Sequence, residues 1–82
     1  MAFDWDHDTV LAGSSVNVRI DGAPCNPVTV QLLVRGEEVD TGIIENIPGD
    51  VDLDVPSGSE SATFEIIVKC DGESDSMNGT VG

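Results

Sequence analysis

Cys25, Cys70 and His7 are the residues of this 82-residue chain whose side chains are best suited to chemistry. The two cysteines are too far apart for a CxxC redox motif, and there is no third cysteine for a zinc site. A thiol nucleophile would need Cys25, His7 and an aspartate to meet, yet nothing around these residues is typical of an activated thiol. We therefore predict no catalytic residues, no cofactor and no enzymatic activity.

Aspartates occupy every second position in two short runs: Asp4, Asp6, Asp8 and Asp50, Asp52, Asp54. In an extended chain this spacing places each set on one side, where carboxylates could bind calcium. The first run lacks the Gly and the distal Glu of a calcium-binding loop, and carboxylates on a straight face diverge from one another. Charged residues on edge strands also prevent sheet-to-sheet aggregation. We expect edge protection and no metal site.

Aromatic side chains alternate with the first aspartates in residues 1–8. Phe3 and Trp5 are candidates for contact with a partner, because aromatic residues in a polar surround are common binding anchors. Asp4 and Asp6 would then meet basic groups on that partner. The alternative is that Phe3 and Trp5 cover one end of the domain.

The formal net charge is −13, from 3 Lys and Arg against 16 Asp and Glu. Such a surface repels phosphate backbones and anionic membranes, so nucleic acid and lipid are poor partners. The charge also opposes association between identical copies, except through the few apolar residues outside the core. The acidity serves either solubility or adaptation to a salty medium, or else it binds cations or a larger protein assembly with a basic surface.

Short alternating runs separated by turn residues predict an all-β chain. The clearest run is 61–70, in which Ala62, Phe64, Ile66, Val68 and Cys70 share one side and the turn Asp71-Gly72 follows. The other expected strands lie within 2–11, 15–20, 28–34, 39–47, 50–55 and 76–81. No run has a helical period, so we predict an antiparallel two-sheet sandwich of about seven strands, with residues 1–8 as an arm or edge strand and 9–82 as one domain.

Two details of this sandwich are also predicted. Gly42 and the adjacent Ile43 and Ile44 interrupt the alternation of the run 39–47, which indicates a bulge or bend there. The core is predicted to contain the inward residues of three runs: Val16, Val18, Val30, Leu32, Phe64, Ile66, Val68.

The order of the runs, and the segment ATFEIIVKCDG before a short last strand, resemble immunoglobulin-like sandwiches of phage virion and bacterial surface proteins over residues 9–81. The resemblance implies that the loop bearing Cys25 lies near the end of the strand bearing Cys70, so that a disulfide is possible. The alternative is two reduced cysteines packed as small apolar residues, which the lack of an export signal favours.

The expected function is a non-enzymatic structural module on a larger assembly, such as a decoration or cement protein of a viral capsid or another virion accessory protein. The alternative is a carbohydrate-binding or cell-surface adhesion module of immunoglobulin-like type, although two Phe and one Trp leave few rings for a sugar platform. The N-terminal residues lack the basic and apolar regions of a signal peptide. We expect cytoplasmic synthesis followed by location in a virion or other extracellular assembly.

Overall fold

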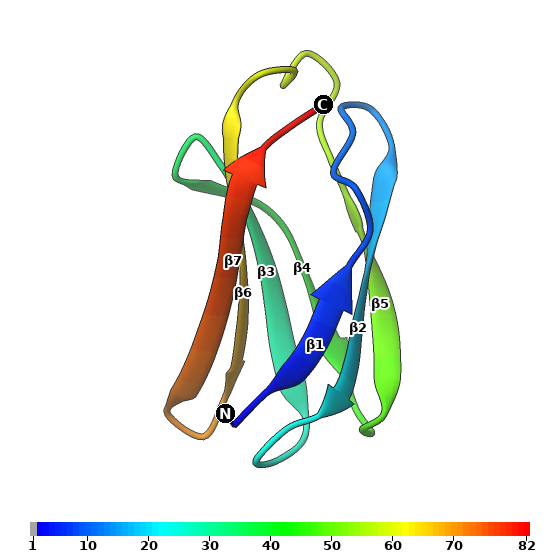
Figure 1. Ribbon diagram of the computed structural model, residues 1–82, viewed down its shortest axis with the longest axis vertical. Coiled ribbons are helices and arrows are strands. Elements are labelled where there is room, and N and C mark those ends of the chain that lie inside the picture. Colours follow the sequence, from blue (N-terminus) through cyan, green and yellow to red (C-terminus); the bar gives the residue numbers. More distant parts are fainter. Residues whose placement is uncertain (1) are drawn as a thin grey trace.

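The computed structural model describes residues 2–82, which form seven strands in two antiparallel sheets that face each other (Figure 1). The strands are β1 (Asp4–His7), β2 (Ser15–Gly22), β3 (Val28–Val34), β4 (Glu37–Ile44), β5 (Gly49–Asp54), β6 (Thr63–Cys70) and β7 (Glu73–Thr80). One sheet has the order β1-β2-β5 and the other has the order β4-β3-β6-β7. The all-β class and the two-sheet arrangement predicted from the sequence are thus confirmed. Within residues 2–82, no helix is long and apolar enough to cross a membrane.

The core lies between the two sheets, and β2, β3 and β6 contribute to it by strict alternation of buried residues. In β3, four residues are buried and the three between them are half-buried, and in β6 four buried residues alternate with half-buried or exposed ones. All seven predicted core residues are buried, and the strands β2, β3 and β6 supply them. β5 adds Leu53, which is fully buried opposite Val16 of β2. The alternation therefore identified the inward face of β2, β3 and β6 correctly.

Two hairpins are closed by two-residue turns in which both residues have a positive φ. Arg35 and Gly36 have φ of 55° and 81° between β3 and β4, and Asp71 and Gly72 have φ of 45° and 81° between β6 and β7. Turns of this kind match the twist of the strands that they join. Since Cys70 pairs directly with Glu73, β7 begins at once and is longer than the expected strand 76–81.

The irregularity that the sequence predicts at Gly42 is found at Val39, where the register of β4 shifts relative to β3. Leu32 pairs with Asp40 and Leu33 pairs with Glu38, so Val39 is the extra residue. Gly42 instead pairs regularly with Val30 and allows β4 to lie close to β5, since a Cβ on Gly42 would be 2.6 Å from Cγ2 of Val51. The prediction of a bulge was correct for this strand, but its position at Gly42 was wrong.

The end of the chain joins the two sheets beyond their regular strands. The amide of Gly82 donates to the carbonyl of Val10 at 2.8 Å, and the amide of Ala12 donates to the carbonyl of Gly82 at 3.1 Å. Val81 is buried and exchanges backbone hydrogen bonds with residues 61 and 62. The segment that follows β1 is thereby held beside the C-terminal residues.

Candidate functional site

The outer side of the three-stranded sheet gathers both runs of aspartates on one surface. We call it the acidic face and define it by its exposed aspartates together with Asn17 and Arg19 of β2; the aspartates are Asp4, Asp6, Asp8, Asp21, Asp50, Asp52, Asp54. β2 lies between β1 and β5, so the two runs flank it on either side. Seven carboxylates and one guanidinium give this face about half of the net charge of −13.

The pairing of the strands arranges these side chains in rows across the sheet. Arg19 lies opposite Asp6 on one side and opposite Asp50 on the other. Asn17 lies opposite Asp52, and its carbonyl accepts a hydrogen bond from the amide of Asp8 at 3.0 Å. Each row therefore has a polar or basic residue on β2, the middle strand, and aspartates beside it on the outer strands.

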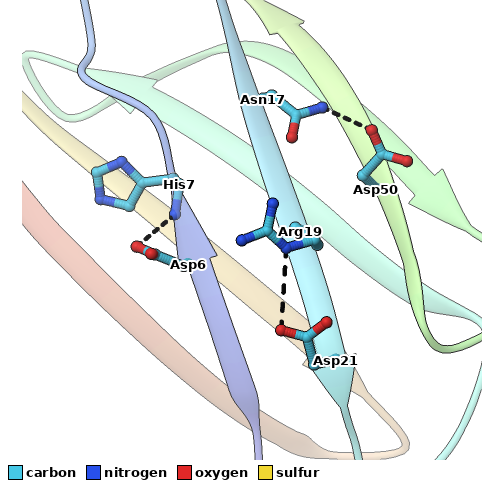
Figure 2. Close-up of polar contacts among 6 residues, drawn as sticks. All are labelled: Asp6, His7, Asn17, Arg19, Asp21 and Asp50. Atoms are coloured by element: carbon cyan, nitrogen blue, oxygen red, sulfur yellow. Dashed lines mark hydrogen bonds and ion pairs between the residues drawn. The ribbon is translucent and has the colours of Figure 1, made fainter.

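Asn17 is the side chain that links two of the carboxylates. Its Nδ2 donates to Oδ2 of Asp50 at 2.7 Å and to Oδ1 of Asp52 at 2.9 Å, and the first of these bonds is drawn in Figure 2. Two like charges are thus held on β5 by one amide group, which has two N–H donors. This arrangement fixes the two carboxylates without neutralising them.

Arg19 neutralises little of the acidic face. Its Nε is 3.9 Å from Oδ2 of Asp21, and both side chains are more than half exposed, at 58% and 53%. Ion pairs as exposed as this contribute little to stability. A hollow of about 30 Å³ lies between β1 and β2, lined by Asp6, His7, Asp8, Asn17 and Arg19. It has room for a water-sized group rather than for an organic substrate.

The four side chains predicted to contact a partner differ in their exposure to solvent. Asp4 and Asp6 are exposed, whereas Phe3 and Trp5 are buried in the core. The expectation that these two aromatic residues are free to serve as anchors was wrong. β1 pairs with β2 as an edge strand, so alternate residues of β1 turn toward the second sheet. Met1, the first residue of the predicted arm, lies outside the described residues.

The buried side of β1 forms an aromatic contact between the two sheets. Nε1 of Trp5 donates to Oδ2 of Asp75 on β7 at 3.0 Å. The ring of His7 packs edge-on against the ring of Phe64, with 5.8 Å between centroids. His7 is therefore part of the packing between β1 and β6.

Cys25 and Cys70 are joined by a disulfide, with 6.0 Å between their Cα atoms. It connects the loop after β2 to the last residue of β6, and both lie at the same end of the sandwich (Figure 1). His7 contacts Phe64, which is six residues and about 20 Å along β6 from Cys70. The structure does not bring Cys25 and His7 together for catalysis.

The aspartate runs also differ from a metal centre in geometry. Among residues 2–82, no three His, Cys, Asp or Glu side chains are arranged to hold a metal ion. The sequence predicted each run separately, but it did not predict that both runs and Asp21 share one face. Only the order β1-β2-β5 brings them together. The partner of Trp5 was missed as well, because Asp75 is 70 residues away in the sequence.

Comparison of the chain with protein-family models, with curated proteins and with solved structures gives no match.

Proposed function

We propose that the protein is a non-enzymatic, immunoglobulin-like structural module that attaches to a larger protein assembly with a basic surface. A decoration or cement protein of a viral capsid, or another virion accessory protein, is the form that we favour. The virion setting and the extracellular location rest on the pattern of strands in the sequence.

The immunoglobulin-like part of the proposal is supported by the strand order. In immunoglobulin constant domains the first, second and fifth strands share one sheet, and the third, sixth and seventh share the other. The sheets β1-β2-β5 and β4-β3-β6-β7 agree with this division, except that β4 joins the second sheet. The disulfide between Cys25, just after β2, and Cys70, at the end of β6, resembles the bridge between the second and sixth strands of those domains.

The observation that carries the attachment is the concentration of carboxylates on the acidic face. Neighbouring like charges destabilise a sheet unless an opposite charge lies against them. A basic partner surface would relieve this repulsion, speed association by electrostatic steering and select against acidic partners. Within this proposal, Asp6, Asp50 and Asp52 meet Lys or Arg on the assembly.

The carbohydrate-binding alternative receives less support from the side chains. Phe3, Trp5 and Phe64 are all the Phe and Trp residues of the chain, there is no Tyr, and all three are buried. A sugar platform needs an aromatic face at the surface. The arrangement of aromatic residues therefore favours the protein-binding module.

The test is co-sedimentation with particles purified from the source of the protein. Wild-type protein should sediment with the particles and be released as the salt concentration rises, because screening weakens attraction between exposed charges. The variant Asp6→Asn/Asp50→Asn/Asp52→Asn should be lost from the particles. The matched control Glu37→Gln/Glu60→Gln/Glu73→Gln removes the same number of charges outside the acidic face and should remain bound.

The proposal would be overturned if wild-type protein did not sediment with the particles. It would also be overturned if both triple variants lost binding equally, because net charge rather than the acidic face would then be responsible. Attachment that did not change with salt would contradict a basic partner surface.

A further inference from the structure

The outer side of the four-stranded sheet contrasts with the acidic face. We call it the hydroxyl-rich face and define it by the outward residues of its strands: Thr29, Gln31, Leu33, Glu38, Thr41, Ile43, Thr63, Glu65, Ile67, Lys69, Ser74, Ser76, Asn78, Thr80. Only three of these residues are charged. The acidic face lies on the other sheet and points away from it.

Apolar side chains are part of this surface. Ile43 is 57% exposed, and Leu33 and Ile67 are half-buried. Glu38 is held to the sheet, because Nε2 of Gln31 donates to its Oε1 at 2.7 Å. In a chain with a net charge of −13, this is the surface where two copies can meet while their acidic faces point outward.

Three alternate residues of β6 make the hydroxyl-rich face complementary to itself. Glu65, Ile67 and Lys69 point outward in turn, since Phe64, Ile66 and Val68 between them are buried. Glu65 and Lys69 are about 13 Å apart along the strand. Consider a two-fold axis that lies between the two faces, runs perpendicular to the strands and passes between the two copies of Ile67. This axis would place Lys69 of each copy over Glu65 of the other.

A hollow beside Glu65 provides space for the incoming lysine. It has a volume of about 240 Å³ and is lined by Leu33, Gly36, Thr63, Phe64, Glu65 and Asn78. A lysine can place its aliphatic stem on such a surface while its ammonium group reaches a carboxylate. In residues 2–82 the only ion pair is Arg19 with Asp21, so Lys69 and Glu65 have no ionic partner there.

We propose that two copies of the chain associate through their hydroxyl-rich faces about this two-fold axis. Ile67 of each copy packs near Ile67 of the other, and two symmetric Lys69–Glu65 ion pairs flank them. Four strands of seven or eight residues cover about 500 Å² per copy, which is less than the roughly 800 Å² per partner of a standard interface. The dimer is therefore weak and forms at high protein concentration.

The test is sedimentation equilibrium of the isolated protein over a range of concentrations up to about 1 mM, the range of Kd that a small interface of this kind implies. The average mass of the wild type should rise from 8.6 kDa toward twice that value. Lys69→Glu should raise the Kd at least about tenfold, because it places like charges in contact. Glu65→Lys should also raise the Kd, although it makes the chain less acidic. The double variant Lys69→Glu/Glu65→Lys, whose net charge equals that of the wild type, should restore the dimer.

Arg19→Glu is the matched control, because it changes the net charge by the same amount as Lys69→Glu but lies on the acidic face. It should leave the Kd within about threefold of the wild type, and thermal melting should show that every variant is folded. A wild type that stays monomeric throughout would overturn the proposal. So would a double variant that does not restore the dimer, or an Arg19→Glu variant as weak as Lys69→Glu. None of these results depends on binding to the assembly.

Discussion

The indole Nε1 of Trp5 donates a hydrogen bond to Oδ2 of Asp75 at 3.0 Å, which connects the edge strand β1 of one sheet to the edge strand β7 of the other. The regular strand pairing runs within each sheet, so this bond is a direct polar connection between the two edges. It satisfies the only N–H donor of the indole at a partly buried position. Together with the pairing of β1 with β2, this contact makes β1 part of the fold rather than a free arm.

Trp5→Phe should lower the free energy of unfolding by about 1 to 2 kcal/mol, because Asp75 loses its donor while most of the aromatic packing is kept. Chemical denaturation measures this change. A double-mutant cycle with Asp75→Ala should give a coupling energy of about 0.5 to 1.5 kcal/mol. Additive effects of the two substitutions would contradict a stabilising contact between these residues.

Phe64→Ala should destabilise the protein by about 3 to 5 kcal/mol, because it removes a large buried ring next to His7. For a domain of this size the loss is enough to unfold much of the population. The neighbouring exposed residue provides the control, since Thr63→Ala should change the stability by less than about 0.5 kcal/mol. A folded Phe64→Ala protein with nearly unchanged denaturation would refute the assignment of the core.

Gly42→Ala should cost about 1 to 3 kcal/mol, because the added Cβ would lie 2.6 Å from Cγ2 of Val51. The destabilisation comes from a steric clash with the side chain of Val51 on the facing strand β5. Val51→Ala should therefore cost less in the Gly42→Ala background than in the wild type. If the two costs simply add, the close approach of β4 and β5 is not the reason for the glycine.

Reduction of the bond between Cys25 and Cys70 should lower the melting temperature substantially. Loop-closure entropy for a separation of 45 residues predicts a loss of about 4 kcal/mol, which corresponds to roughly 15 to 30 °C for a domain of this size. Thermal melting with and without dithiothreitol measures the shift, and Cys25→Ser/Cys70→Ser should reproduce it. An unchanged melting curve, together with two titratable thiols, would show that the bond does not form in solution.

Calcium at millimolar concentration should leave the stability almost unchanged beyond an effect of ionic strength. The exposed aspartates of the acidic face repel one another, so any salt should stabilise the fold slightly by screening. Sodium chloride at matched ionic strength is the control. A rise in melting temperature specific to calcium would instead identify ligands among these aspartates.

The alternation of residues along β6 was sufficient to predict its buried side, and the pair Asp71-Gly72 was sufficient to predict the turn after it. Both signals are local. Gly42 misled the prediction because the reason for a glycine there is the distance to Val51, which depends on how the sheets pack. The burial of Trp5 could not be predicted from residues 1–8 either, since it depends on pairing with β2 and on Asp75. The acidic face required the order of strands, which alternation alone does not define.

The hydrogen bonds of Gly82 with Val10 and Ala12 have a mechanical consequence. In Figure 1 the start of β1 and the C-terminal end of the chain lie toward opposite ends of the long axis, whose extent is 35 Å. A force that separates these ends pulls residue 82 one way and the segment after β1 the other way, along the direction of the strands. The backbone bonds between them are then loaded together in shear, rather than broken one after another as in the peeling of a hairpin. We therefore expect a module built in this way to resist tension that is applied along its long axis.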